Sequence, residues 1–192
     1  ELDKQNPRYL TLVNRLLNLF ENKILGNGNN LVREYLDQSF QPSLVNSFII
    51  EPGHHYEWAW LLNWSDKIHQ RKKYGTLTKT LFDTGWRLGW DFNNGGVFDE
   101  VDCVNNQVSL STKRFWPLLE LIKVLSVLPG NSHGDDLTSA LTIVLERYIQ
   151  PNGIWTERFD QNWTAIDRTM PTSSLYHMAM TISVLEARKT KK

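Results

Sequence analysis

Apolar residues recur every three to four positions in six stretches of this chain, and Leu10, Val13 and Leu17 are an example near its start. This period is that of a helix with one apolar face. The stretch 113–128 is apolar on several faces, which is typical of an inner, buried helix. The pattern therefore predicts helices over residues 6–25, 53–74, 76–88, 113–128, 135–149 and 173–187.

Three shorter segments between these helices share one local pattern. They read NLVREYLD (30–37), GGVFDEVD (95–102) and NGIWTERFD (152–160). Each begins at a Gly/Asn turn, alternates a few apolar or aromatic residues with polar ones and ends at an aspartate, which predicts a short strand leading into a turn. The final residues Asp37, Asp102 and Asp160 are 65 and 58 positions apart. A nearly constant interval of this length indicates a repeated unit.

Each predicted repeat is a helix, a short hairpin and a second helix, and the chain holds three of them. The first helix of each pair is amphipathic and is placed outside, whereas the second is more apolar and is placed inside. Paired helices of this kind form open solenoids or closed toroids. A toroid of six such units would need roughly 360 residues. The 192 residues therefore predict one all-α domain, residues 1–192, that is half of a toroid.

A half toroid has two open flanks where apolar helices lack neighbours. We expect the isolated chain to pair with a second copy of itself or with the missing half, or else to aggregate. A monodisperse monomer in sedimentation analysis would contradict this expectation.

Charge and composition exclude several classes of function. The chain has 21 Lys+Arg and 21 Asp+Glu, which argues against a nucleic-acid binder or a polybasic membrane anchor. No apolar run is long enough to span a bilayer. The single cysteine, Cys103, excludes an internal disulfide and favours a reducing, cytoplasmic compartment. Eight Trp, six Tyr and eight Phe indicate either a large aromatic core or a pocket with flat aromatic walls.

The first group of chemically notable residues is EPGHHYEW, residues 51–58. His54 and Glu57 are three positions apart and share one helix face. A carboxylate beside an imidazole fixes its tautomer and stabilises its protonated form, as acid–base catalysis requires. The alternative is a surface His–Glu pair beside core tryptophans.

The second group is KRFWPLLE, residues 113–120. Trp116 and Glu120 are four positions apart and face the same way on an apolar helix. A buried carboxylate is rare unless it is paired or functional. The alternative is a structural ion pair of Glu120 with Arg114 or with a lysine.

The third group is PTSSLYH, residues 171–177, in which Ser173 or Ser174 is the predicted helix cap. His177 is placed in the first helical turn, where the helix dipole favours a neutral imidazole that can act as a general base. The alternative is an ordinary histidine at a helix start.

These groups hold equivalent positions in successive repeats, since His54, Trp116 and His177 follow one another at intervals of 62 and 61 positions. In a helical toroid the starts of the inner helices open on one face, so these side chains are expected to converge on one cavity. Two histidines, two carboxylates and aromatic walls suit proton transfer on a polar ring such as a sugar. No HExxH or Cys/His spacing predicts a metal site. Glycoside hydrolysis by the two carboxylates Glu57 and Glu120 is an alternative, but it gives no role to the two histidines, so proton transfer fits better.

The motifs EPGHHYEWAWLL, GGVFDEVD with KRFWPLLE, and SSLYH resemble, in order and spacing, those of the N-acylglucosamine 2-epimerase superfamily. This superfamily includes cellobiose 2-epimerases and mannose-type aldose–ketose isomerases. The resemblance covers nearly the whole chain and implies the C-terminal half of an (α/α)6 barrel. It also implies cofactor-independent proton transfer at the sugar C2 carbon. Catalysis is assigned to His54 and His177, and substrate binding to Glu57, Trp58, Arg114, Trp116 and Glu120.

The chain departs from that family in two respects. The N-terminal half, with its Arg-containing and further His-containing motifs, is absent, and Leu118-Leu119 stand where polar residues are common. The residues of KRFWPLLE and GGVFDEVD are closer to those of the isomerase-like branch. The expected partners are a monosaccharide or disaccharide and the missing half or a second copy, with no nucleic acid, membrane or metal.

Two other functions are compatible with the same residues. One is a non-catalytic carbohydrate-binding or assembly module that retains the fold, which would bind sugar without proton exchange. The other is a helical-repeat scaffold for a protein partner, which the inward-facing carboxylates and histidines disfavour. The sequence leaves open which sugar is used, whether it is phosphorylated, whether the reaction is epimerisation or isomerisation, and which histidine acts first.

Overall fold

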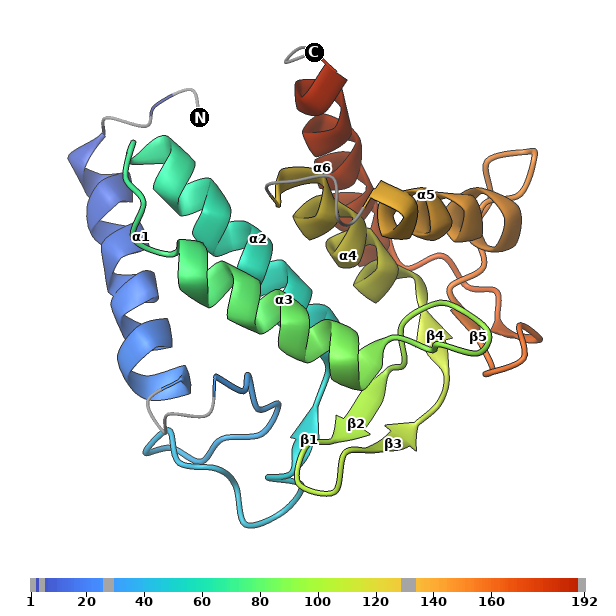
Figure 1. Cartoon of the computed structure of the whole chain (residues 1–192), viewed down its shortest axis with the longest axis horizontal. Helices are drawn as coiled ribbons and strands as arrows, with labels where there is room; N and C mark the ends of the chain where they lie inside the picture. Colours follow the sequence, from blue (N-terminus) through green and yellow to red (C-terminus); the bar gives the residue numbers. More distant parts are fainter. Residues whose placement is uncertain (1–2, 4–5, 26–29, 129–133, 190–192) are drawn as a thin grey trace.

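The computed structural model describes residues 3, 6–25, 30–128 and 134–189. Within these residues the chain forms three successive helical hairpins (Figure 1). The helices are α1 (Pro7–Leu19), α2 (Pro52–Ile68), α3 (Gly75–Gly89), α4 (Phe115–Val127), α5 (Gly134–Ile143) and α6 (Thr172–Lys189). A π-helical turn extends α1 and another extends α5; these are η1 (Phe20–Ile24) and η2 (Val144–Tyr148). The predicted all-α class and the three hairpins are confirmed.

Helices α2, α4 and α6 form an inner row, in which α4 packs against α2 on one side and α6 on the other. Outside this row, α3 packs on α2 and α5 packs on α4 (Figure 1). Because α4 has neighbours on several sides, its residues from Pro117 to Leu125 are all buried. The apolar pattern of residues 113–128 therefore identified the central inner helix correctly. In α6, at the end of the row, Ser174 and Thr181 are the buried residues.

Helix α2 ends six residues earlier than predicted, at Ile68. Gln70 has a left-handed backbone with φ of 51°, which interrupts the helix. The Asp66 side chain then accepts a hydrogen bond from the backbone N–H of Tyr74 at 2.7 Å. Residues 69–74, most of which are polar or charged, therefore belong to the connection to α3.

Two predicted helix starts are also wrong. Lys113–Arg114 is strand β4, because these residues pair with the next hairpin before α4 begins. Helix α6 begins at Thr172, so the predicted caps Ser173 and Ser174 lie inside it. The Ser174 hydroxyl donates to Glu157 Oε2 at 2.8 Å and so joins α6 to the hairpin before it.

Two antiparallel three-stranded sheets lie at the starts of the inner helices (Figure 1). One has the order β1 (Ile49–Ile50), β2 (Glu100–Asp102), β3 (Gln107–Leu110), and the other has the order β4 (Lys113–Arg114), β5 (Arg158–Phe159), β6 (Ala165–Asp167). In each sheet, the strand that leads into an inner helix pairs with the hairpin of the following repeat. The sheets therefore tie successive repeats together and fix the inner-helix starts relative to one another.

The three aspartates that revealed the repeat all perform the same structural task. Each side chain accepts hydrogen bonds from backbone N–H groups in the turn that follows it, which is a common use of aspartate in tight turns. The donors are Ser39 and Gln41 for Asp37, Val104 and Asn105 for Asp102, and Asn162 and Thr164 for Asp160. In the first repeat the turn forms but the predicted strand over 30–37 does not, since only an isolated bridge joins Leu36 to Pro42.

The two ends of the inner row expose apolar side chains. Tyr9, Leu12 and Leu16 of α1 are each at least half exposed. At the other end, Tyr176 and Ile182 of α6 are similarly exposed. These are the open flanks that half a ring is expected to have, and association of the chain through them remains a prediction.

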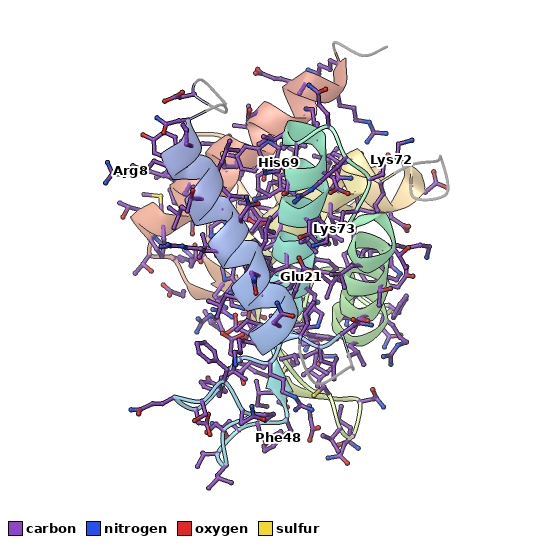
Figure 2. The ribbon with its side chains drawn as sticks, turned by 90° about the vertical axis from the view of Figure 1, so that its left-hand side faces the viewer. Arg8, Glu21, Phe48, His69, Lys72 and Lys73 are labelled. Atoms are coloured by element: carbon purple, nitrogen blue, oxygen red, sulfur yellow. The ribbon has the colours of Figure 1, made fainter. Side chains whose placement is uncertain are left out.

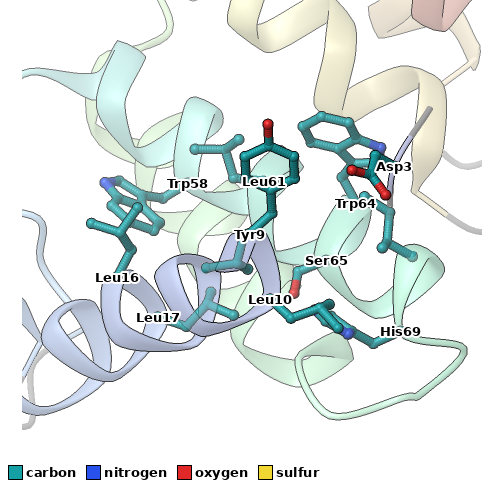
Figure 3. Close-up of a pocket in the computed structure, with 12 residues that line it drawn as sticks. Asp3, Tyr9, Leu10, Leu16, Leu17, Trp58, Leu61, Trp64, Ser65 and His69 are labelled. Atoms are coloured by element: carbon teal, nitrogen blue, oxygen red, sulfur yellow. The ribbon is translucent and has the colours of Figure 1, made fainter. Parts of the chain in front are cut away.

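A groove of about 570 Å³ runs between α1 and α2 (Figure 3). Its walls are apolar and include Leu16, Trp58, Leu61 and Trp64. On the same side of the molecule, the Lys73 ammonium contacts the Glu21 carboxylate at 2.7 Å and anchors the end of α1 to the α2–α3 connection (Figure 2). Among the described residues, none of the helices has the length and apolar character needed to cross a membrane.

Candidate functional site

The starts of α2 and α4 lie in close contact because residue 53 is a glycine. A Cβ atom at Gly53 would lie 2.6 Å from the Trp116 ring and 2.9 Å from the Cβ of Pro117, which is too close for any side chain. The indole of Trp116 therefore covers the first turn of α2. His54, the next residue, is placed directly beside that indole.

Trp116 lies between the two predicted catalytic histidines. Its ring centre is 4.9 Å from that of His54 and 5.4 Å from that of His177. The guanidinium of Arg114 lies 5.4 Å from the same ring. The structure thus brings together side chains that the sequence places one whole repeat apart.

His54 is hydrogen-bonded to a carboxylate that precedes it in the chain. Its Nδ1 lies 2.8 Å from Glu34 Oε2 and 3.9 Å from Glu51 Oε2. Burial alone would lower the pKa of His54, but the hydrogen bond to Glu34 and the nearby negative charges outweigh it, so the pKa lies above its usual value. Because a carboxylate only accepts hydrogen bonds, Nδ1 carries the proton and Nε2 is the nitrogen available for proton exchange.

His177 forms the equivalent pair with Glu120. Its Nδ1 lies 2.5 Å from Glu120 Oε1. The ammonium of Lys123 lies 2.6 Å from the same oxygen, without the direction of a hydrogen bond, and 4.2 Å from the ring centre of Trp60. Glu120 and Lys123 are both fully buried. Glu120 therefore forms an ion pair with a lysine, as the alternative interpretation proposed, and also holds a histidine.

The second oxygen of Glu120, Oε2, has no hydrogen-bond partner in the part of the chain that the structure describes. The Glu57 carboxylate lies in the same cluster, since one ligand atom from each of Glu57, Glu120 and His177 falls within 4.8 Å of the others. Burial raises the pKa of Glu57, and the charge of Glu120 raises it further. Glu57 therefore binds a proton more readily than an exposed glutamate does.

The predicted pairing of His54 with Glu57 does not form. The two residues share a face of α2 as expected, but the carboxylate bonded to His54 is Glu34, and Glu57 joins the Glu120–His177 cluster. His177 is the sixth residue of α6, which begins at Thr172, and so lies in the second helical turn and not in the first as predicted. The helix dipole is therefore a smaller influence on His177 than its contact with Glu120.

Trp58 and Arg114 lie apart from the centre of this cluster. Trp58 stacks on Phe20 at 3.6 Å and lines the groove beside α1 (Figure 3). Arg114 contacts Glu51 at 2.7 Å and Asp99 at 2.9 Å. Its position over Trp116 indicates that it supports the indole. A role for either residue in binding substrate stays a prediction.

Among the residues that the structure describes, two sets of three side chains could present ligands to a metal ion. They are Glu34, Glu51 and His54, and Glu57, Glu120 and His177. A cation of the protein already pairs with one carboxylate of each set: Arg114 with Glu51, and Lys123 with Glu120. These fixed charges oppose the binding of a divalent cation, and the arrangement suits proton transfer better.

Sequence reasoning missed Glu34 and Lys123. Glu34 stands three residues before the hairpin residue Asp37, as Asp99 and Glu157 stand three before their own hairpin aspartates. That repeated position could have identified Glu34 as a residue with a role in the site. Lys123 follows Glu120 by three positions on one helix, which is the spacing of a helical ion pair.

His55, next to His54, has a structural role. It is fully buried, and its Nε2 accepts a hydrogen bond from the backbone N–H of Val32 at 3.2 Å. Burial lowers the pKa of His55 to about 4. Protonation of His55 at Nε2 would also place its N–H against the backbone N–H of Val32, and two donors repel each other.

This histidine predicts a loss of stability in mild acid. Below pH 6.5 the unfolded chain takes up a proton at His55 that the folded chain does not take up until about pH 4. Stability therefore falls as pH decreases through this window, by about 2 kcal/mol between pH 7.5 and pH 5. Urea unfolding should show this loss in the wild type and a smaller one in His55→Gln. In the control His69→Gln the loss should match the wild type, and equal losses in all three proteins would contradict the prediction.

A family model described as N-acylglucosamine 2-epimerase (GlcNAc 2-epimerase) matches residues 1–181. Among curated proteins, a mannose-6-phosphate isomerase of Rhizobium meliloti (strain 1021) is 24% identical, over 93% of this chain and 48% of its own length.

Two solved structures have the same fold. A crystal structure of D-mannose isomerase has a TM-score of 0.84 at 24% identity, over 95% of this chain and 51% of its own. The cellobiose 2-epimerase of Bacillus thermoamylovorans B4167 has a TM-score of 0.76 at 15% identity, over 97% of this chain and 48% of its own. The chain thus spans about half the length of these relatives, and its three hairpins correspond to half of an (α/α)6 barrel.

Proposed function

Because this chain belongs to the N-acylglucosamine 2-epimerase family, we propose that it carries the acid–base site of a sugar isomerase or epimerase. One observation carries the proposal: two imidazoles flank a single indole, and each is bonded through Nδ1 to its own carboxylate. In such a pair the other ring nitrogen can take up and return a proton. Two such groups in one cluster suit a reaction that moves a proton between neighbouring carbon atoms or between two faces of one carbon.

The proposed reaction is proton transfer at C2 of an open-chain aldose. The C2–H is acidic because it adjoins the C1 carbonyl, and one imidazole removes this proton as a base. The electron pair of the broken C–H bond moves towards the carbonyl oxygen and gives an enediol(ate). Return of a proton to C1, with transfer of the O2 hydroxyl proton to O1, produces the ketose. Return of a proton to the opposite face of C2 restores the C1 carbonyl and produces the epimer. His54 and His177 are the proposed pair, and no cofactor is consumed.

Three neighbouring side chains have distinct proposed tasks. Glu57, which lies in the cluster of Glu120 and His177, hydrogen-bonds to a substrate hydroxyl. Glu120, whose side chain is fully buried, holds the imidazole of His177 in position through Oε1. Trp116 supplies a flat apolar face, to which the C–H face of a sugar ring or chain can pack.

We propose an aldose of the mannose type as the substrate. The support is that a curated protein that is 24% identical is named mannose-6-phosphate isomerase and that a solved structure with a TM-score of 0.84 is a D-mannose isomerase. Arg114 is the cation nearest the indole, and it is already engaged by Glu51 and Asp99. This arrangement favours an unphosphorylated sugar.

A non-catalytic carbohydrate-binding module is the second candidate. One observation favours it: the grooves of about 570 and 580 Å³ on these helices are lined by residues other than His54, Trp116 and His177, so neither groove encloses the two histidines. A further wall, from the other half of a ring, would then be needed to enclose the substrate. The two candidates differ in whether the C2 proton exchanges with solvent.

The test is exchange in D2O. The 192-residue chain and the longest natural polypeptide that contains it are incubated with D-mannose, and the C2 proton and the appearance of fructose are followed by proton NMR. We expect deuterium at C2 and formation of the ketose. Saturable binding of mannose with no exchange in either protein would identify a binding module and overturn the proposal.

A further inference from the structure

We propose that Glu34 is a positioning residue that fixes the tautomer and the charge of His54; this inference rests on the proposed function. Glu34 lies outside the helices, on the segment between α1 and β1. Its carboxylate receives the Nδ1–H of His54 at 2.8 Å. Its own backbone N–H donates to the carbonyl of Ile49 at 3.1 Å, which anchors Glu34 to the strand that leads into α2.

The contact of Glu34 with His54 is one instance of a repeated arrangement. Each hairpin has an acidic residue three positions before its turn aspartate, and each of these acids accepts a hydrogen bond from the start of the next inner helix. The three contacts are Glu34 with His54 Nδ1 at 2.8 Å, Asp99 with the backbone N–H of Arg114 at 3.0 Å, and Glu157 with the Ser174 hydroxyl at 2.8 Å. The fold therefore builds this contact three times, and in the first repeat its donor is the imidazole proposed for catalysis.

Other charged groups near His54 do not replace Glu34. Glu51 Oε2 is 3.9 Å from Nδ1, and its charge is compensated by Arg114 at 2.7 Å. Glu57 acts on His54 through its charge and lies in the cluster of Glu120 and His177. Glu34 is therefore the carboxylate that both bonds to the imidazole and stabilises its protonated form.

Two properties of His54 follow from this contact. Because Glu34 holds the Nδ1–H, the neutral ring presents Nε2 to the substrate in a defined orientation. When Nε2 takes up a proton, the positive charge lies beside a carboxylate in a half-buried site, where water screens it less. Both properties act on the chemical step rather than on the affinity for sugar.

The test is the variant Glu34→Gln, which keeps an oxygen that can accept the Nδ1–H and removes the charge. We expect the pKa of His54, measured by NMR of its ring nitrogens, to fall by about one unit. In the form of the protein that turns over sugar, kcat should fall about tenfold or more, while KM stays within about twofold. Glu34→Asp should recover part of both losses. Glu146→Gln, which removes an exposed carboxylate on η2, is the control and should change neither.

The outcomes separate this inference from the proposed function. An unchanged His54 pKa and unchanged kcat in Glu34→Gln would overturn the role of Glu34. A fall in kcat with no change in the titration of His54 would also overturn it, because that result indicates a structural effect. If the pKa falls as expected but the wild-type protein shows no C2 exchange, the tautomer is fixed as inferred and the proposed function fails.

Discussion

Replacement of His177 by alanine is expected to slow exchange of the C2 proton by about a thousandfold, because a positioned acid or base contributes roughly 10²- to 10⁴-fold to such a step. His177 is bonded to Glu120, beside Trp116 and close to the carboxylate of Glu57. Alanine would leave these neighbours in place and remove the proposed base. Exchange is measured by NMR in D2O in whichever form of the protein turns over mannose.

His69→Ala is the matched control for this variant. His69 follows the last turn of α2 and lines the groove beside α1, so its loss removes an imidazole at a distance from Trp116. We expect exchange in this control at the wild-type rate. Because His177 is partly exposed, with 16% of its side chain accessible, the fold should survive His177→Ala, and thermal unfolding checks this. Exchange by folded His177→Ala at the wild-type rate would rule out His177 as the base.

The features that could be predicted from the sequence are those set by neighbours within a few positions. The start of α2 and the turns at Asp37, Asp102 and Asp160 each depend on contacts inside one repeat. The apolar pattern of α4 is also local, although the helix packs on α2 and α6 of the neighbouring repeats. The regular interval between repeats then placed the inner-helix starts together without any knowledge of long-range contacts. Trp116 between His54 and His177 follows from that placement alone.

The features that could not be predicted depend on contacts between distant segments. Helical spacing correctly put Glu57 and His54 on one face of α2, but it gave no information on Glu34, which approaches from 20 residues earlier in the chain. Trp58 shares nearly the same face, and the helical period alone could not show that Phe20 would cover it. The strand at Lys113–Arg114 was missed because pairing with Arg158–Phe159 of the next repeat overrides an apolar pattern that begins immediately afterwards.

Lys113 illustrates how such a long-range contact can dominate stability. Its ammonium is fully buried, donates to Asp91 Oδ2 at 2.8 Å and lies 4.5 Å from the ring centre of Trp163. It also donates to the carbonyls of Gly95 at 2.7 Å and Gln161 at 3.0 Å. The side chain, which comes from the first residue of strand β4, therefore joins the loop after α3 to the hairpin of the third repeat.

Lys113→Met is expected to destabilise the fold by about 3–5 kcal/mol, the usual cost of leaving one partner of a buried ion pair without the other. Asp91 is only 2% exposed. Burial alone would raise its pKa, and it is the Lys113 ammonium, with backbone N–H groups, that holds the pKa below its usual value. Without the ammonium, Asp91 must either stay charged in a buried site or take up a proton. The loss of unfolding free energy in Lys113→Met should therefore be smaller in mild acid, where Asp91 is protonated more easily. It should also be smaller in the double variant Lys113→Met/Asp91→Asn.

The matched control is an exposed ion pair. Lys79 contacts Asp83 at 2.5 Å on the surface of α3, with more than half of the lysine side chain accessible, and such pairs contribute about 0.3–0.5 kcal/mol. Urea unfolding of Lys113→Met and Lys79→Met should therefore differ by about 3 kcal/mol or more. A similar small loss in both variants would mean that water or a local rearrangement replaces the ammonium. If Lys113→Met is as destabilised as expected and the double variant recovers part of the loss, that part of the free energy of unfolding is assigned to the ion pair of Lys113 with Asp91.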